Sequence, residues 1–208
     1  MPPSYPVTFS VDYPERQLNR VSTFFRIFAV IPIAIVAALL PGGELTSSVG
    51  SSGGYGGIAA GALIFVPIVL MLLVEKKYPR WWYDWNLELL RFVNRIGVYV
   101  ALMDDAYPST DERQAVHLDF PYPDAQQLSR GLPLVKWFLA IPHYIVLFFL
   151  YIGVFLSVIG AWFAILFTGR YPKGIFNFVE GTIRWHNRVV GYAFVLVTDD
   201  YPPFRLSA

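Results

Sequence analysis

An uncharged stretch of unusual length limits what this chain can fold into. From Trp137 to Gly169 there is no Asp, Glu, Lys or Arg. A single helix of that length would measure about 50 Å at roughly 1.5 Å per residue, which exceeds a hydrocarbon core of about 30 Å. The stretch is also slightly short for two full spans with a turn between them. It therefore predicts a tight helical hairpin with arms at residues about 132–149 and 152–168, turning near Leu150 to Gly153.

A second apolar region lies nearer the N-terminus. Between Arg26 and Glu75 the only charged residue is Glu44, which falls in a Gly- and Ser-rich segment typical of a flexible loop. This pattern predicts hairpin helices at residues about 20–40 and 58–75. Hydrophobic residues make up 55% of the chain and charged residues 15%, whereas a soluble domain has about a quarter charged residues. The sequence thus predicts an integral membrane protein.

Sequence motifs recur along almost the whole chain, which indicates an internal repeat. The segment YPRWWYDWNLELLRFVNRIGVYV begins at Tyr78, and the segment YPKGIFNFVEGTIRWHNRVVGYA begins at Tyr171. Both open with Tyr-Pro and a basic residue, and both carry Arg-x-x-Asn-Arg at the same distance. The predicted fold class is an all-α integral membrane protein of two pseudo-repeats, residues 1–110 and 111–208. Each pseudo-repeat has a short β-strand, a transmembrane helical hairpin and an interfacial amphipathic helix.

The strands and the interfacial helices have their own sequence signals. VTFSVDYP and VHLDFPYP alternate apolar and polar residues, which predicts strands at 7–13 and 116–122. These strands either pair with each other or add to the sheet edge of a partner protein. The repeated Tyr-Pro segments predict amphipathic helices at about 80–103 and 174–197. These helices should lie at the membrane interface, because Trp and Tyr favour the headgroup layer.

Each amphipathic helix has a narrow polar stripe with arginines along it. The first stripe covers only about 80° of the helix circumference. Two interpretations remain open. The arginines either face headgroups and water, with Glu180 and Arg184 as an i,i+4 pair, or they bind anionic lipid headgroups or an acidic partner surface. The candidate lipid- or partner-binding residues are Arg80, Arg91, Arg95, Arg184, Arg188, Trp81, Trp82 and Trp85.

The distribution of positive charge predicts an orientation. All 16 Lys and Arg lie outside the two predicted hairpin tips, residues 41–57 and 150–153. Because positive charge near span ends marks the cytoplasmic side, both termini, both strands and both amphipathic helices are predicted to be cytoplasmic. The predicted location is multi-pass in the inner (plasma) membrane. The net charge of +1 argues against a nucleic-acid partner.

Several of these motifs together resemble a known family. They are the Tyr-Pro-Arg-Trp run from Tyr78, the Leu-Arg-Phe and Asn-Arg that follow it, and the closing Asp-Asp-Tyr-Pro-Pro-Phe. The chain looks like two tandem copies of the domain-of-unknown-function family DUF4389, a family of bacterial membrane proteins. The resemblance implies a membrane protein and supplies no activity, cofactor or site. The second copy departs from the pattern at Gly174 and Ile175, where the first copy has tryptophans.

Few residues are candidates for chemistry. The chain has no cysteine, which excludes disulfides and thiolate ligands. His143 follows Ile-Pro inside a predicted membrane arm, and it is either a hydrogen-bonded packing residue or, as a weak candidate, a haem ligand. His186 is predicted to be an interface residue. His117 with Asp119 lacks the further ligands that a stable metal site needs.

Two acidic pairs, Asp104–Asp105 and Asp199–Asp200, precede Tyr-Pro and are predicted to make turn hydrogen bonds rather than to catalyse. We expect no enzyme activity, no metal and no cofactor. The predicted function is a scaffold or accessory subunit that docks to or stabilises a larger membrane complex at the cytoplasmic leaflet, or self-associates. One alternative is a protein that binds or organises anionic membrane lipids, and a second is a haem-bearing redox membrane anchor.

Overall fold

The structure is a computed structural model that describes residues 5–39, 78–110, 112, 114–126, 128–129 and 131–208. This part of the chain is mostly helical, with one two-stranded sheet. The elements follow in the order β1 (Thr8–Val11), α1 (Arg20–Leu39), α3 (Arg80–Val100), β2 (Val116–Asp119), α4 (Leu132–Leu139), α5 (Ile141–Thr168), α6 (Lys173–Val190) and the π-helical turn η2 (Gly191–Val195). The predicted hairpin helix at about 58–75 lies outside the described residues.

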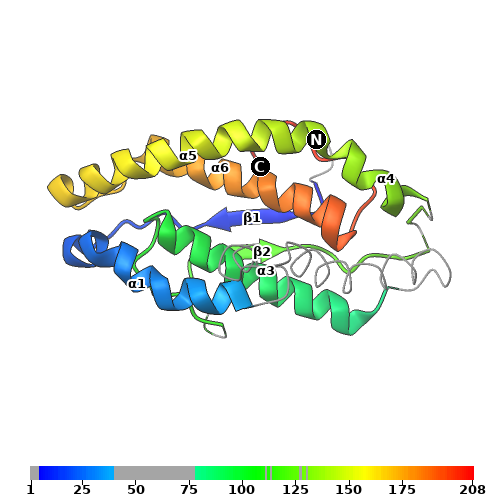
Figure 1. Cartoon of the computed structure of the whole chain (residues 1–208), viewed down its shortest axis with the longest axis horizontal. Helices are drawn as coiled ribbons and strands as arrows, with labels where there is room; N and C mark the ends of the chain where they lie inside the picture. The colour runs from blue at the N-terminus through cyan, green and yellow to red at the C-terminus, as the bar shows by residue number, and fades with distance from the viewer. Residues whose placement is uncertain (1–4, 40–77, 111, 113, 127, 130) are drawn as a thin grey trace, which may run out of the picture.

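The strands β1 and β2 pair with each other in antiparallel register, with Phe9 opposite Leu118. Alternate residues point inward, as the period-two pattern predicts, so that Phe9, Val11, Val116 and Leu118 are buried. β1 packs on α6 and β2 packs on α3 (Figure 1). Each strand therefore lies on a helix from the other half of the chain. Of the two predicted roles, the strands take the mutual pairing.

Helices α3 and α6 meet through a pair of buried asparagines. Asn94 Nδ2 donates to Asn187 Oδ1 at 2.9 Å, and Asn187 Nδ2 donates to Asn94 Oδ1 at 2.7 Å. Each amide also donates to the carbonyl four residues earlier, at Leu90 or Ile183. These bonds satisfy two polar groups that would otherwise be costly to bury. They fix how the two helices sit against each other.

Both amphipathic helices end slightly earlier than predicted, where the backbone turns sharply. The expected ends were about 103 and 197, whereas α3 ends at Val100 and α6 ends at Val190, from which the π-helical turn η2 continues to Val195. Leu102 has φ 64° and Leu196 has φ 62°. A positive φ at a leucine is uncommon and incompatible with a continuing right-handed helix.

The predicted hairpin turn near Leu150 to Gly153 is wrong, since α5 continues without a break from Ile141 to Thr168. Gly153 is the only good turn former in the predicted bend, and a lone glycine inside a helix costs only about 1 kcal/mol. The break falls earlier, at Ala140, between α4 and α5. Pro142 lies in the first turn of α5, where its missing N–H is tolerated.

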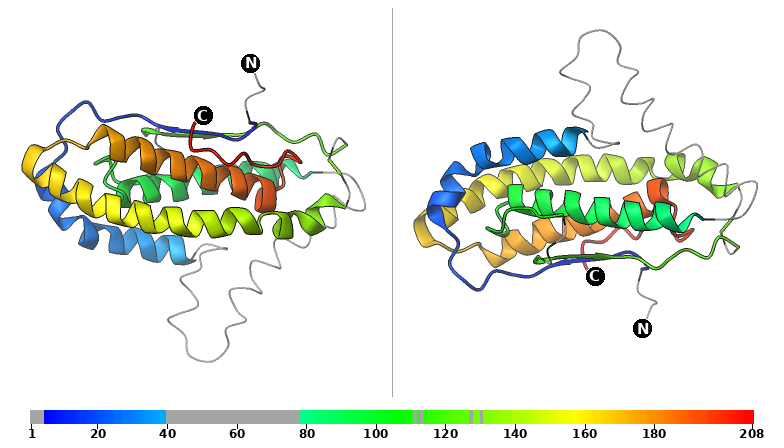
Figure 2. Two further views of the ribbon diagram at one scale, coloured as in Figure 1. Left: turned by 90° about the horizontal axis from the view of Figure 1, so that it is seen from above. Right: turned by 90° about the horizontal axis from the view of Figure 1, so that it is seen from below.

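The elements form three layers (Figure 2). The strand pair makes one outer layer, α3 and α6 make the middle layer, and α1 with α5 make the opposite outer layer. α5 is long and apolar enough to cross a membrane, and in the part of the chain that the structure describes it is the one helix that meets this test. The long axes of the helices run in roughly the same direction as the strands (Figure 1).

Candidate functional site

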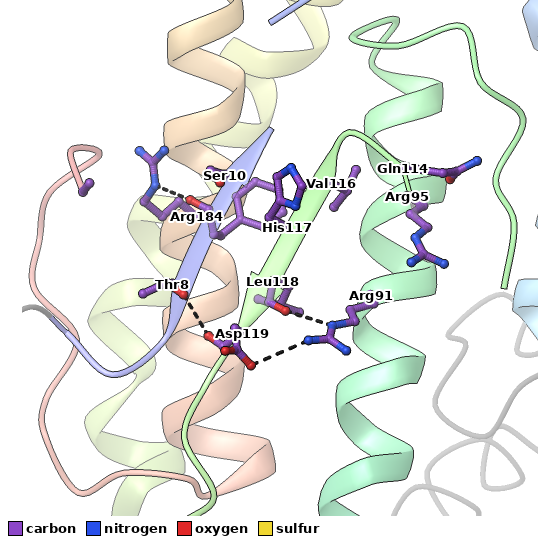
Figure 3. Close-up of a pocket in the computed structure, with 12 residues that line it drawn as sticks. Thr8, Ser10, Arg91, Arg95, Gln114, Val116, His117, Leu118, Asp119 and Arg184 are labelled. Atoms are coloured by element: carbon purple, nitrogen blue, oxygen red, sulfur yellow. Dashed lines mark hydrogen bonds and ion pairs between the residues drawn. The ribbon is translucent and has the colours of Figure 1, made fainter. Parts of the chain in front are cut away.

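The arginine stripes of α3 and α6 point at the strand pair. Arg91 Nε donates to the Leu118 carbonyl at 2.9 Å, and Arg184 Nε donates to the Phe9 carbonyl at 2.8 Å. Phe9 and Leu118 are directly opposed, so the two arginines bind carbonyls at the two outer edges of the sheet (Figure 3). Unpaired strand edges are sites of unwanted pairing with other chains. The arginines cover part of each edge and tie it to the helix below.

Arg95 and Arg188, the last arginine of each stripe, are buried. Arg95 Nη1 donates to the Ser109 carbonyl at 2.6 Å. Arg188 donates to the carbonyls of Arg205 and Ser207 at 3.2 and 2.9 Å. Burial lowers the pKa of Arg188, and the positive charges of Arg205 and Arg184 lower it further. These two side chains hold the segments that follow the helices instead of facing headgroups.

Carboxylates balance the two arginines at the strand edges. Arg184 pairs with Glu180 one turn earlier, and both side chains are largely buried. Arg91 pairs with Glu88 at 2.6 Å and lies 3.6 Å from Asp119, both of which are exposed. The i,i+4 pair predicted for α6 is therefore present, in a less solvated setting than a free helix surface would give.

A polar cavity of about 680 Å³ opens over the strand pair (Figure 3). Three of the predicted arginines, Arg91, Arg95 and Arg184, contribute to its lining. The hydroxyl-bearing and charged residues of the outer sheet face, Thr8, Ser10, His117 and Asp119, also line it. Arg95 Nε is buried and has no hydrogen-bond partner within the described chain. The cavity therefore provides space beside a guanidinium group whose Nε has no partner within the described chain.

The three predicted tryptophans of α3 divide between surface and core. Trp81 is 68% exposed and Trp85 is 48% exposed. Trp82 is buried in a small cluster with Tyr78 and Leu196. Arg80 lies outside the cavity lining and stacks over the Tyr122 ring at 5.7 Å. The candidate residues thus form two groups, with the arginines near the strands and the exposed tryptophans at the N-terminal end of α3.

Sequence reasoning missed two buried cations, Arg26 and Lys136. Arg26 donates to the Tyr99 and Asp104 carbonyls and to Asp105. Lys136 donates to the Thr198 carbonyl at 2.7 Å and pairs with Asp199 at 2.8 Å. Burial lowers the pKa of Lys136, and Asp199 opposes that effect. The available signal was the position of each cation, just before a long apolar run and matched by an Asp-Asp pair further along.

The first acidic pair makes a local turn bond, as predicted, in which Asp104 Oδ1 accepts from the Asp105 amide at 2.7 Å. Both pairs also accept hydrogen bonds from distant parts of the chain. Asp105 accepts a hydrogen bond from the Asn19 amide at 2.7 Å, and Asp199 accepts one from the Ser129 amide at 2.7 Å. Each of these carboxylates therefore joins the start of an apolar helix region to the turn after an amphipathic helix. The contact with a buried cation is the part that the sequence reading did not include.

His143 is enclosed by aromatic side chains. Its Nδ1 accepts a hydrogen bond from Trp185 Nε1 at 3.0 Å, and its ring stacks on Phe204 with 4.1 Å between centroids. The residue is fully buried, so a haem iron could reach its other ring nitrogen, Nε2, only if the packing around that atom opened. This packing supports the interpretation of a core histidine.

The other two histidines are separate from it. His186 contacts the Tyr151 ring, and burial lowers its pKa to about 4. His117 pairs with Asp12 across the strands at 2.9 Å. Among the described residues, no three His, Asp or Glu side chains are grouped as a metal site would need.

Comparison with known families gives one match. Residues 133–205 match the model of the family described as Domain of unknown function (DUF4389). The match covers the region from α4 to the C-terminal segment as one copy, so it does not show the two tandem copies that the sequence motifs predict. No curated protein matches the chain, and no solved structure matches it.

Proposed function

We propose that this chain is a non-enzymatic membrane scaffold or accessory subunit made of two copies of one structural unit. The second copy is the region that matches the family model. The proposal of a first copy rests on the sequence motifs together with the contacts described next. The scaffold role rests on how the polar and apolar surfaces are used.

Hydrogen bonds in the first half recur in the second half at positions that the sequence motifs equate. Arg26 over the Tyr99 ring corresponds to Lys136 over the Tyr192 ring. Arg91 at Leu118 corresponds to Arg184 at Phe9. Four tyrosine hydroxyls make two further matched pairs of hydrogen bonds. Tyr13 donates to the Tyr171 carbonyl as Tyr122 donates to the Tyr78 carbonyl. Tyr171 donates to the Ala101 carbonyl as Tyr78 donates to the Val195 carbonyl. This correspondence supports duplication over the described parts of both halves.

The scaffold role rests on one observation: the arginine side chains bind groups within the chain, whereas two tryptophan side chains are exposed at the surface. Arg95, Arg184 and Arg188 donate to backbone carbonyls of the same chain. Trp81 and Trp85 are exposed at one end of α3. Exposed aromatic residues of this kind commonly mark interaction sites. A partner that covers the two indole rings would remove apolar surface from water at about 25 cal/mol per Å².

The proposed location is the inner (plasma) membrane, with the strand layer and both termini on the cytoplasmic side. The clustering of Lys and Arg outside the apolar regions supports this orientation. The proposal of a multi-pass chain rests, within the described residues, on α5 alone. Support for membrane association comes from that helix and from the family match.

Photo-crosslinking from the tryptophan positions tests the docking role. A benzoylphenylalanine at position 81 or 85 should yield one defined protein adduct in native membranes, and the same group at exposed Ser10 should not. Light scattering of protein extracted in mild detergent should then show a complex or a self-associated species. A strictly monomeric species with no adduct from either tryptophan position would contradict the scaffold role.

The polar cavity favours a second candidate, binding of anionic lipid headgroups. Arg91, Arg95 and Arg184 line it, and guanidinium groups suit phosphate oxygens well. Arg91→Gln should reduce the anionic lipid retained in native mass spectrometry by severalfold, whereas Arg16→Gln, at an exposed arginine outside the cavity lining, should not. Equal retention in both variants would remove this candidate.

A further inference from the structure

α1 and α5 lie on the side of the described fold opposite the strand pair (Figure 2), and both expose apolar side chains. Large apolar side chains recur along α5 at helical spacing and are exposed, including Ile145, Phe148, Ile152, Phe155, Ile159, Phe163 and Phe167. α1 adds a parallel row of exposed residues, Phe24, Phe28, Ile31 and Ile35. The two helices pack side by side, with Trp162 Nε1 donating to the Thr23 carbonyl. The opposite half of the α5 circumference packs inward.

Contacts between α5 and α6 show which polar groups lie level with the middle of α5. Near one end of the contact, a Cβ at Gly160 would lie 3.8 Å from the Ile175 side chain. At the other end, His143 accepts the hydrogen bond from Trp185. Glu180 and Arg184 lie between Ile175 and Trp185 on α6. A Cβ at Gly153 would lie 3.1 Å from the Phe178 ring, so Glu180 is level with the central part of α5, whereas Arg184 is nearer to residue 143.

The strand pair lies at that same level. Val11 N on β1 donates to Glu180 Oε1 at 3.4 Å, and Arg184 binds the carbonyl of Phe9 on the same strand. β1 pairs with β2 along its whole length. The strand layer carries exposed carboxylates, with Asp119 73% exposed and Asp12 70% exposed at their side chains. If α5 crossed the bilayer, the helix and the strands beside it would place these carboxylates at the depth of the hydrocarbon. Each such charge costs about 2.5 kcal/mol or more at the bilayer centre.

We propose that α5 lies along the membrane surface rather than through the membrane. In this arrangement the joint α1–α5 face rests on the cytoplasmic leaflet, and α3, α6 and the strands stack away from it toward water. The partner of this face is the lipid bilayer itself. This arrangement departs from the multi-pass proposal, because α5 is the one described helix on which a membrane crossing rests. The inference concerns a different surface from the tryptophan end of α3, and it holds whether or not that end docks another protein.

Two properties of the surface favour lipid over a protein partner, and the length of α5 favours a flat helix over a crossing one. The stretch from Trp137 to Gly169 has no charged residue, and α5 has a mean hydropathy of 2.4 with only 11% of its most apolar window buried. Exposed cations stand at the end of α5 in position to meet anionic headgroups, namely Arg20, Arg170 and Lys173. α5 is about 42 Å long at roughly 1.5 Å per residue, which exceeds a hydrocarbon core of about 30 Å. A helix that lies flat on the membrane can have any length.

The internal correspondence between the halves points the same way. β1 and β2 are antiparallel neighbours with Phe9 opposite Leu118, so the axis relating the halves runs perpendicular to the strands and to α5. When α5 lies flat, this axis is the membrane normal and both halves face the same side. If α5 crossed the membrane, the axis would lie in the membrane plane and the two halves would have opposite orientations. Both halves concentrate their Lys and Arg in the same elements, so opposite orientations would put one of these positive clusters on the wrong side of the membrane.

Depth measurements along α5 test the proposal. The full chain has no native cysteine, so Phe148→Cys, Phe155→Cys and Phe163→Cys can each carry a single spin label. The variants are reconstituted into vesicles of phosphatidylethanolamine and phosphatidylglycerol. Collisional access to oxygen and to a water-soluble nickel chelate then gives each label's depth. Ser10→Cys, on the outer sheet face, is the matched water-exposed control.

The flat arrangement predicts similar depths at all three labels, about 5–10 Å below the headgroups, and full chelate access at position 10. A profile in which one label reaches about 15 Å, the centre of the hydrocarbon core, with shallower labels beside it would overturn the proposal. So would exclusion of both oxygen and chelate from all three labels, because that result means protein covers the face. Unchanged tryptophan fluorescence in each variant verifies that the fold is retained.

Discussion

Arg26 and Lys136 occupy matching places in the two halves of the chain, and they make equivalent contacts through a guanidinium group and an ammonium group. Arg26 binds two carbonyls and Asp105 while its guanidinium lies 4.2 Å from the centre of the Tyr99 ring. Lys136 binds one carbonyl and Asp199, with its ammonium 5.0 Å from the Tyr192 ring. Both cations are buried. We call each of these groups a latch, because it joins an apolar helix region to the turn after an amphipathic helix.

The difference between the latches shows what the fold requires at this place. It requires a buried cation that lies over a tyrosine ring, pairs with a carboxylate and donates to a backbone carbonyl. It does not require the planar fork of arginine, since a lysine with fewer donors holds the second latch. Removing one partner from a buried ion pair is expensive, because the remaining charge loses its compensation. The latches should therefore dominate the mutational sensitivity of both halves.

Loss of the cation should give the largest effect. Arg26→Met and Lys136→Met should each lower the free energy of unfolding by about 3–5 kcal/mol, with the Arg26 variant the more damaging because three acceptors lose their donor. Arg26→Lys, which copies the second latch, should recover most of the loss. Denaturant unfolding in a fixed detergent measures all three. A loss below about 1 kcal/mol in both Met variants would show that neither latch stabilises the fold.

His186 makes the second half sensitive to pH in a way that the first half is not. The matching residue in the first half is Val93. Because burial lowers the pKa of His186 from 6.5 to about 4, the unfolded chain binds an extra proton between these pH values. Stability should be complete above about pH 6.5 and fall as pH drops to about 4, by at most about 3.5 kcal/mol at roughly 1.4 kcal/mol per pKa unit.

His186→Val, which copies the first half, should remove this pH dependence. His117→Val, at an exposed histidine on β2, should leave it in place. Thermal unfolding of the three proteins at pH 4.5, 5.5 and 7 provides the comparison. A pH slope that survives in His186→Val would assign the effect to other groups.

The asparagine pair tests how strongly the halves depend on each other. Asn94→Leu alone leaves a buried amide without its partner and should cost about 1–3 kcal/mol. The double variant Asn94→Leu with Asn187→Leu should cost less than the sum of the single variants, since no buried amide is left unpaired. A double-mutant cycle gives the coupling, which should be at least about 1 kcal/mol. Strict additivity would mean that the two amides do not interact.

The strand-edge arginines should differ modestly. Arg184 binds two carbonyls and a largely buried Glu180, whereas Arg91 binds one carbonyl and exposed carboxylates. Arg184→Met should therefore cost about 1–2 kcal/mol more than Arg91→Met, because hydrogen bonds to charged groups are worth more when buried. Chemical unfolding of the two variants decides this. The reverse order would contradict the structural difference between the two edges.

Much of the local structure could be predicted from the sequence, because it depends on short-range periodicity. The alternation in VTFSVDYP and VHLDFPYP placed both strands, and the Tyr-Pro segments placed the starts of α3 and α6. The turn assigned near Leu150 failed because apolar composition alone does not distinguish a hairpin from one long helix. A single Gly153 cannot impose a bend that the packing of α5 on α6 does not require.

The candidate site was harder to predict, since its partners are distant in sequence. Helical spacing correctly placed the arginines on one stripe, but nothing local indicates that Arg184 binds the Phe9 carbonyl or that Arg95 binds Ser109. Backbone carbonyls at the strand edges can be recognised as hydrogen-bond partners of the arginines only when the position of the strands in the folded protein is known. The same holds for Lys136, which the sequence presents as an ordinary positive charge near a membrane segment.

The central claim is that the two halves interlock through strands that cross to the opposite helix. Ser10 and His117 are directly opposed on the exposed face of the sheet, and Asp119 is displaced from Ser10 by two residues. In native membranes, Ser10→Cys with His117→Cys should form an intramolecular disulfide on mild oxidation, detected as a linked peptide by mass spectrometry. Ser10→Cys with Asp119→Cys should form it far more slowly. Absence of the 10–117 link, or equal yields from both pairs, would contradict the interlocked arrangement.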